Sequence, residues 1–201
     1  MVFKAADLLD KADKGDIVSQ KIFRLMTPLI KFRACRDVRK VAGDAMEIRG
    51  GLGYIEDWLD PKILRDSHLG SIWEGTSNII SLDTIRALKK DNNIHIFKNF
   101  LIDSVKNNSI KKHEKYLLSA IEKVFNFIES EIKDDFTSSS RQITSSLYYL
   151  SSAIFLIKEG NYCEDLSYRT KISELILKYK IDKNSPITRD DIDFALIKEL
   201  I

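Results

Sequence analysis

The sequence predicts an all-α protein, an up-down helical bundle with a helical extension on its C-terminal side. Its 201 residues include only three prolines and eight glycines, and so few turn residues favour long helices over turn-rich β structure. Apolar residues recur at helical spacing along nearly the whole chain. Short polar or glycine-containing segments separate these runs. We therefore expect helices over residues 3–14, 17–49, 61–68, 76–90, 94–107, 111–133, 138–159, 163–180 and 188–200.

Start and stop signals support the first of these boundaries. Asp16 follows a glycine and can cap the long helix that begins at residue 17. Pro28 lies inside that helix, and we expect it to kink or break the helix because proline lacks an N–H and crowds the preceding turn. The pair Gly50-Gly51 ends the helical pattern sharply.

The next boundaries have equally simple signals. Residues 55–60 are expected to form a loop, and Pro61 suits the first turn of a short helix. Thr76 or Ser77 can cap the helix that follows. The polar residues 91–93 mark a boundary, so we expect a bundle portion over residues 1–92 and a helical extension over residues 93–201 that packs on it.

Composition limits the function classes. The formal net charge is +2, with 44% hydrophobic and 31% charged residues, which gives no argument for binding nucleic acid or a membrane. No apolar run is long enough for a transmembrane helix, and the N-terminal residues do not resemble a secretory signal. We expect a cytoplasmic protein in which Cys35 and Cys163 are reduced, buried thiols.

Metal and nucleophile chemistry find no support in the sequence. His68, His95 and His113 share no metal-ligand spacing with one another or with a cysteine, and we expect His95 and His113 on the surface. We expect no metal site. The sequence also shows no Ser-His-Asp arrangement and no phosphate-binding loop of the P-loop type.

One helix carries the densest basic run, formed by Lys31, Arg33, Arg36, Arg39 and Lys40. A solvated or subunit-facing helix surface is the favoured interpretation. Contact with phosphate groups is the alternative, and it would make binding strongly salt-dependent.

Two motifs remain open when they are taken alone. The glycine turn Gly50-Gly51-Leu52-Gly53-Tyr54 follows a helix instead of a strand, so a helix C-cap is favoured over contact with a cofactor phosphate. In the segment Trp73-Glu74-Gly75-Thr76, the carboxylate precedes a helix whose positive end favours its ionised form. Glu74 is therefore either a structural residue at a helix start or a general base.

The motifs together are more specific than each alone. Residues 45–54, the Leu64-Arg65-Asp66 segment and residues 72–78 follow one another at a spacing that resembles the C-terminal helical domain of acyl-CoA dehydrogenases. The resemblance covers roughly residues 3–90 and looks most like the alkylation-response, AidB-like branch. It implies an FAD-dependent oxidoreductase that introduces an α,β double bond into an acyl-CoA.

The resemblance implies roles for particular residues. Glu74 matches the base that removes the α-proton of the acyl thioester. Gly50 and Gly51 match a glycine pair that contacts FAD bound mainly to a neighbouring subunit. Thr76 matches a residue that touches the flavin or its ribityl-phosphate region, Asn78 stands where a longer Gln reaches the adenine side, and Trp73 offers a dry, flavin-facing wall.

Some positions depart from the family pattern. Glu47 stands where the family often has Gln, and Leu52 stands where Asn is frequent. The adjacent pair Arg65 and Asp66 is interpreted as structural. The N-terminal helical domain and the central β domain of the family have no counterpart in the sequence, so we expect the chain to be incomplete as an enzyme on its own.

Three hypotheses follow from the resemblance. The chain is the C-terminal portion of an acyl-CoA dehydrogenase, active with acyl-CoA only when a homo-oligomer or a partner polypeptide completes it. Alternatively, it is a non-catalytic oligomerisation or interaction module derived from the family. A nucleic-acid function, by analogy with the AidB-like branch, is disfavoured because the C-terminal half is electrically neutral.

Overall fold

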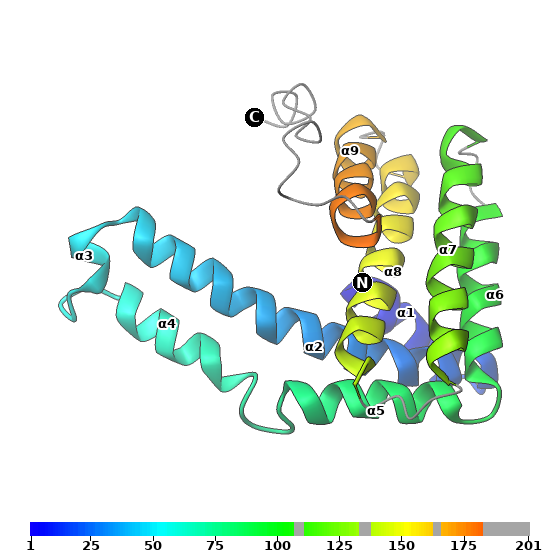
Figure 1. The fold of residues 1–201 in the computed structure, drawn as a ribbon, viewed down its shortest axis with the longest axis horizontal. Helices are drawn as coiled ribbons and strands as arrows, with labels where there is room; N and C mark the ends of the chain where they lie inside the picture. The colour runs from blue at the N-terminus through cyan, green and yellow to red at the C-terminus, as the bar shows by residue number, and fades with distance from the viewer. Residues whose placement is uncertain (107–110, 133–137, 163–165, 183–201) are drawn as a thin grey trace.

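The computed structural model describes residues 1–106, 111–132, 138–162 and 166–182 (Figure 1). These residues form helices and contain no strand, which confirms the all-α prediction. The helices are α1 (Val2–Asp13), α2 (Ile17–Ile48), α3 (Gly51–Tyr54), α4 (Asp60–Leu69), α5 (Ser77–Lys89), α6 (Asn93–Lys106), α7 (Lys111–Ile132), α8 (Ser140–Tyr162), α9 (Leu166–Ile176) and the short π-helix η1 (Leu177–Ile181). The predicted helix over 188–200 lies outside the described residues.

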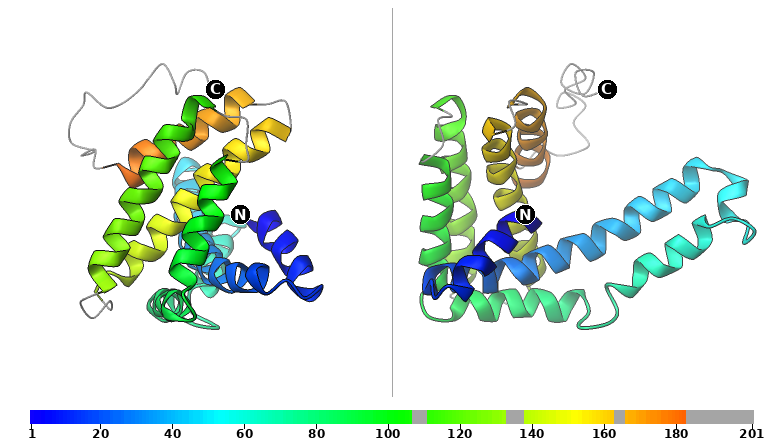
Figure 2. Two further views of the ribbon diagram at one scale, coloured as in Figure 1. Left: turned by 90° about the vertical axis from the view of Figure 1, so that its right-hand side faces the viewer. Right: turned by 180° about the vertical axis from the view of Figure 1, so that it is seen from behind.

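The molecule consists of a helical body and a long arm. α2 runs from the body to the tip of the arm, α3 turns the chain there, and α4 returns along α2 (Figure 1). α5 then continues beneath the body, where α6, α7, α8 and α9 stand side by side (Figure 2). The first half of α2 and all of α5 therefore belong to the body, while the second half of α2 belongs to the arm.

Local signals explain where α2 begins. The Asp16 carboxylate caps the helix by accepting hydrogen bonds from the backbone N–H groups of Val18 at 3.0 Å and Ser19 at 3.3 Å. It also accepts one from the Ser19 hydroxyl at 2.7 Å. This cap satisfies donors that have no partner inside the helix.

Pro28 does not break α2, so that part of the prediction is wrong. One continuous helix of 32 residues runs through it. Pro28 is buried in the body, where the tertiary packing of α2 keeps the helix intact despite the missing N–H. The Thr27 hydroxyl, one residue earlier, donates to the Phe23 carbonyl at 3.0 Å.

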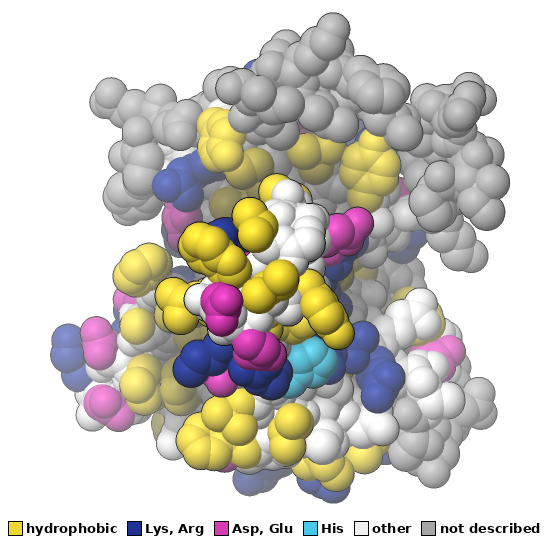
Figure 3. Space-filling model, turned by 90° about the vertical axis from the view of Figure 1, so that its left-hand side faces the viewer, with side chains coloured by type: hydrophobic (Ala, Val, Ile, Leu, Met, Phe, Trp, Pro, Cys, Tyr) yellow, Lys and Arg dark blue, Asp and Glu magenta, His cyan; other side chains and the backbone are white. Residues whose placement is uncertain are grey.

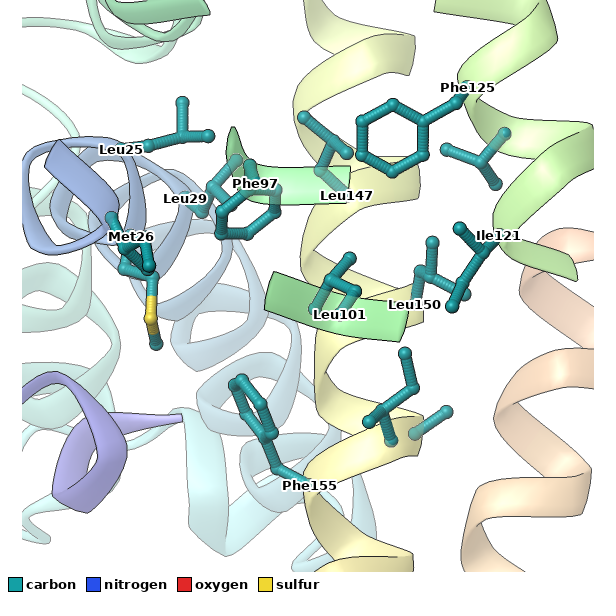
Figure 4. Packing of buried hydrophobic residues seen from close by; sticks show 14 of the residues in the cluster. Leu25, Met26, Leu29, Phe97, Leu101, Ile121, Phe125, Leu147, Leu150 and Phe155 are labelled. Atoms are coloured by element: carbon teal, nitrogen blue, oxygen red, sulfur yellow. The ribbon is translucent and has the colours of Figure 1, made fainter. Parts of the chain in front are cut away.

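A single apolar core holds the body together, and it draws side chains from both predicted parts of the chain. Figure 4 shows it between α2, α6, α7 and α8, with Leu25, Met26, Leu29, Phe97, Leu101, Ile121, Phe125, Leu147, Leu150 and Phe155. Burial of such side chains supplies the main stabilisation of a helical body. The predicted division between residues 92 and 93 stays a prediction, and it falls in a turn where Asp91 and Asn92 have φ values of 50° and 61°.

Candidate active site

Glu74 lies in a tight turn between α4 and α5. Its backbone is left-handed, with φ of 54°, and Gly75 follows with φ of 106°. A left-handed conformation is uncommon for a residue with a side chain, and it persists only where the surroundings hold it. The φ of Gly75 favours glycine at this position, and a Cβ atom there would lie 3.0 Å from Ile80 Cδ1 and would crowd that side chain.

Lys31 holds this turn against the middle of α2. Its Nζ donates to the Trp73 carbonyl oxygen at 3.1 Å and to the Glu74 carbonyl oxygen at 3.3 Å. The same ammonium group lies 3.7 Å from Glu74 Oε2. The partly buried side chain of Lys31 therefore links both the backbone and the carboxylate of Glu74, the candidate base, to α2.

The carboxylate of Glu74 faces outward. Its side chain is 76% exposed, and the neighbouring Trp73 is 59% exposed. With both side chains exposed, the described residues do not enclose the carboxylate, and the role expected of Trp73 as a dry wall stays a prediction. An enclosed site would need apolar surface from outside the described residues.

Thr76 and Asn78 continue the same surface into the start of α5. Thr76 occupies the N-cap position, as expected, but its side chain makes no capping hydrogen bond. Asn78 Oδ1 accepts a hydrogen bond of 2.6 Å from Arg141 Nε at the start of α8. Beside it, the Ser81 and Ser140 hydroxyl groups lie 3.2 Å apart in a buried contact, so α8 fixes the first turns of α5.

The glycine turn ends α2 as predicted and forms the tip of the arm. Gly50 is left-handed with φ of 60°, and a Cβ atom at Gly51 would meet nothing within 4 Å. Gly53 is different, since a Cβ atom there would lie 2.2 Å from the Met46 carbonyl oxygen. The first two glycines therefore present open backbone, and the third allows α3 to pack against the end of α2.

Similarity to known proteins now adds to this geometry. Residues 1–89 match the protein-family model described as "Acyl-CoA dehydrogenase, C-terminal domain". Residues 1–89 are therefore similar to the C-terminal domain of that family. The match contains the Glu74 turn, the glycine turn and the arm that carries both.

Relatives extend the similarity into the rest of the chain. "Acyl-CoA dehydrogenase family member 11" of Caenorhabditis elegans is 34% identical over 117 residues, covering 57% of this chain and 19% of that protein. "Putative acyl-CoA dehydrogenase AidB" of Escherichia coli (strain K12) is 27% identical over 159 residues, covering 79% of this chain and 27% of that protein. The chain therefore spans between about a fifth and about a quarter of the length of these two curated relatives.

A solved structure shows the same fold. The crystal structure of Caenorhabditis elegans ACDH-11 in complex with C11-CoA superimposes with a TM-score of 0.73 at 28% sequence identity, over 90% of this chain and 34% of that chain. This coverage is too large to come from residues 1–89 alone. The helices after residue 89 are therefore part of the arrangement that this chain shares with ACDH-11.

The two sequence motifs of the acyl-CoA dehydrogenase domain are far apart in the structure. The glycine turn lies at the tip of the arm, and the Glu74 turn lies at the other end of α4, where the arm joins the body (Figure 1). In the described residues the two motifs therefore lie at opposite ends of α4. The role implied for Gly50 and Gly51, contact with a cofactor held mainly by a neighbouring subunit, stays a prediction.

The arm of this domain exposes many large apolar side chains. Figure 3 looks at the molecule from the tip of the arm, and apolar groups stand out on it between charged ones. The exposed apolar residues of the arm and of the Glu74 turn are Val38, Val41, Ile48, Leu52, Tyr54, Ile55, Trp58, Leu59, Ile63, Leu69, Ile72 and Trp73. An apolar surface of this kind is typical of a region that packs against another protein.

The structure separates the predicted basic run into different environments. Lys31 binds the Glu74 turn, Arg33 pairs with Asp37, and the exposed Lys40 pairs with Asp44 at 2.6 Å. The run is therefore not one uniform solvated face.

Among the described residues, Arg65 and Asp66 bind other partners and not each other. Arg65 donates to the two carboxylate oxygens of Glu56 at 2.6 and 3.1 Å, which fixes the loop after α3. Asp66 accepts from Lys62 at 2.5 Å. Both contacts lie on the surface of the arm.

Other predicted positions have mixed outcomes. His95 is exposed, as predicted, but the prediction for His113 is wrong, because its side chain is 13% exposed and its Nε2 lies 2.7 Å from Glu174 Oε1. Cys35 is a free thiol and only half buried, and Cys163 lies outside the described residues. In the described part of the chain, no three His, Cys, Asp or Glu side chains gather as a metal site would require, and no helix is long and apolar enough to span a membrane.

Sequence reasoning did not assign Lys31 or Arg141 to the site. Lys31 was noted as a member of the basic run. Its contact with Glu74 was not predicted, because the two residues are 43 positions apart in the sequence. Arg141 reaches Asn78 across 63 positions, and no local pattern in the sequence marks it.

Proposed function

We propose that the chain supplies the C-terminal-domain part of an acyl-CoA dehydrogenase, in which Glu74 removes the α-proton of an acyl thioester. The observation that carries this proposal is the constrained turn of Glu74. A left-handed backbone, held by Lys31 through two carbonyl oxygens, presents the carboxylate outward from a family motif. A general base has to be held in place before its substrate arrives, and this turn provides that placement.

The residues present fit a flavin only in part. Gly50 and Gly51 offer open backbone, Thr76 has a hydroxyl that is not used in capping, and Trp73 exposes an indole face. These residues would hold different parts of FAD. When bound, FAD would accept the hydride that leaves the β-carbon of the acyl chain. Glu47 is less suitable beside a pyrophosphate, since two negative charges repel each other.

Acyl-CoA is the substrate class that the comparison supports. ACDH-11 was solved with C11-CoA bound, and its fold matches 90% of this chain. The exposed carboxylate of Glu74 lies on an open surface of the described residues. An acyl chain bound beside it would therefore need further protein surface to enclose it. The proposal therefore includes assembly with protein that supplies these walls, either further copies of the chain or a partner polypeptide.

The test uses the protein in the assembly that it forms in its native host. That assembly is mixed with a saturated acyl-CoA, FAD and an artificial electron acceptor, and formation of the 2-enoyl-CoA is measured. Wild-type protein is expected to turn over, whereas Glu74→Gln removes the base and should abolish the reaction. The matched control Lys40→Gln changes a distant surface charge and should keep the wild-type rate. Equal rates for Glu74→Gln and wild type would overturn the role of Glu74.

A second candidate is a non-catalytic assembly module. The exposed apolar side chains of the arm favour it, because they would support association without any chemistry at Glu74. Sedimentation of the wild type and of a Leu52→Ser, Trp58→Ser double variant tests this candidate. A larger wild-type mass that falls in the double variant, together with no turnover in any assembly, would favour this module over the enzyme.

A further inference from the structure

A groove runs along one face of α8, and Asp37 of α2 and Ile176 of α9 border it. Its volume is about 450 Å³. The floor of the groove is a stripe of α8 residues at helical spacing, namely Tyr148, Tyr149, Ser152, Phe155, Leu156 and Glu159. At the rise of an α-helix this stripe is about 16 Å long. We call it the α8 groove.

The side chains of the α8 groove are suited to contact with a further element. Tyr148, Tyr149 and Leu156 are only half buried. The Ser152 hydroxyl is buried and has no hydrogen-bond partner within the described residues. Apolar side chains in the open, beside a polar atom that lacks a partner, are typical of a surface that another segment covers.

One end of the α8 groove carries positive charge. Lys180 Nζ lies 5.6 Å from the centroid of the Tyr149 ring, and Arg33 Cζ lies 4.9 Å from the same centroid. Arg33 pairs with Asp37, whereas Lys180 makes no ion pair within the described part of the chain. Lys178 lies in the same last turn of η1. An acidic segment would therefore be attracted to this end.

The last described residue, Asp182, fixes the point from which the chain continues. Its carboxylate accepts hydrogen bonds from the Tyr116 hydroxyl at 2.5 Å and from Lys123 Nζ at 2.8 Å. Asp182 comes only two positions after Lys180, which borders the Tyr149 end of the groove. Residues 183–187 can span at most about 18 Å, so they are long enough to bring the residues after them to that end.

The sequence after this connector has the pattern that the groove requires. It lies outside the described residues, and the sequence predicts a helix over 188–200. Seven of the ten residues over 192–201 are apolar. Ile192, Leu196 and Leu200 recur at every fourth position and would share one face of that helix. A helix of this length extends about 20 Å, which is close to the length of the α8 stripe.

The charges of the segment match the groove as well. Its acidic residues gather near its start, at Asp190, Asp191 and Asp193. A segment that enters beside Lys180 would bring these carboxylates to the positive end of the groove.

We propose that residues 188–200 dock as a helix in the α8 groove, with Ile192, Leu196 and Leu200 against α8. The docked segment covers the open face of α8. It also contacts α2 at Asp37, in the half of α2 that belongs to the arm, and so braces the arm against the body. This inference does not depend on the role proposed for Glu74.

The experiment is photo-crosslinking in the full chain. The photoreactive amino acid p-benzoylphenylalanine replaces Tyr148 in one protein and Leu156 in another, and the adducts are mapped by mass spectrometry after digestion. Both probes are expected to join residues 188–201 of the same chain. The Tyr148 probe should react nearer Ile192 and the Leu156 probe nearer Leu200, because the segment enters from the end beside Lys180. The same probe at Tyr54, at the tip of the arm, should give no such adduct.

Variants of the segment test which side chains hold it. Leu196→Ser and Leu200→Ser together should lower the adduct yield at least about tenfold, since two buried apolar side chains are lost. The control Lys198→Ser changes the opposite face of the predicted helix and should keep the yield. The double variant should also show faster amide exchange in a peptide covering residues 33–44 of α2, while circular dichroism checks that each protein is folded.

Mixing unlabelled chains with ¹⁵N-labelled chains separates a contact within one chain from a contact between copies. Adducts of mixed label would assign the groove to the segment of a second copy and would contradict the proposal. Absence of any adduct with residues 188–201 from both probes would also contradict it. Equal yields in the double variant and in Lys198→Ser would show that the apolar face does not hold the segment.

Discussion

Lys31 and Glu74 are joined across 43 positions of the chain by the same ammonium group that binds the backbone of the turn. Lys31 Nζ lies 3.1 Å from the Trp73 carbonyl oxygen, 3.3 Å from that of Glu74 and 3.7 Å from Glu74 Oε2. The left-handed conformation of Glu74 is thus supported by α2. A residue in the basic run, far from the family motif in sequence, is part of the candidate site.

Replacing Lys31 by methionine should loosen the Glu74 turn. Two hydrogen bonds to carbonyl oxygens disappear, and we expect the turn to lose about 1–3 kcal/mol of local stability. Amide hydrogen exchange measured by mass spectrometry should be faster in a peptide covering residues 69–80. Lys40→Met, which loses only an exposed ion pair with Asp44, should leave that peptide unchanged. Equal exchange in both variants would count against the role of Lys31.

Two glycines of the same turn should respond differently to alanine. Gly53→Ala places a methyl group 2.2 Å from the Met46 carbonyl oxygen, so the backbone of α3 must shift, at a cost of about 1–3 kcal/mol. Gly51→Ala meets no atom within 4 Å and should change stability by less than about 0.5 kcal/mol. Urea denaturation of the two variants measures the difference, and similar midpoints would contradict the packing described for α3.

The shared core predicts that α6 supports the family domain. Leu101 is fully buried in the cluster that also contains Leu25 and Leu29 of α2. Leu101→Ala should therefore lower the free energy of unfolding by about 2–5 kcal/mol, and its single unfolding transition should include α2. The exposed Leu52 provides a control, because Leu52→Ala creates no cavity. A separate, unchanged transition for residues 1–89 would show that the two parts fold independently.

The Asp16 cap predicts a pH effect. Hydrogen bonds from the Ser19 hydroxyl, the Ser19 N–H and the Val18 N–H lower the pKa of the Asp16 carboxyl. A lowered pKa in the folded state stabilises the protein above the ordinary carboxyl pKa, and this stabilisation is lost as the pH falls. Asn is also a good N-cap residue and does not titrate in this range. The urea midpoint should therefore fall further between pH 7 and pH 3 in wild type than in Asp16→Asn.

Much of the fold followed from local signals. The cap at Asp16, the stop at Gly50 and the proline in the first turn of α4 gave helix boundaries close to those observed. Pro28 was the exception, because packing of the first half of α2 in the body outweighs one lost hydrogen bond. The direction of the arm could not be foreseen, since it depends on how α4 packs along α2.

The candidate site was predictable only where the family motifs lie. Glu74 and the glycine turn were identified from their spacing, whereas their separation along the arm was not. The exposure of Trp73 in the described residues could not be predicted either, because it depends on tertiary packing and not on the local sequence. Arg141 could not be assigned at all, because tertiary packing alone brings α8 to Asn78.

The central claim is that Glu74 acts as a base on an acyl thioester, and loss of the α-proton measures this step most directly. The native assembly is incubated with FAD and a saturated acyl-CoA in D₂O, and exchange at the α-carbon is followed by NMR in both recovered substrate and product. The account predicts deuterium at the α-carbon with wild type and with Lys40→Gln, and none above the uncatalysed background with Glu74→Gln. Undiminished exchange in Glu74→Gln, or none in wild type, would contradict it.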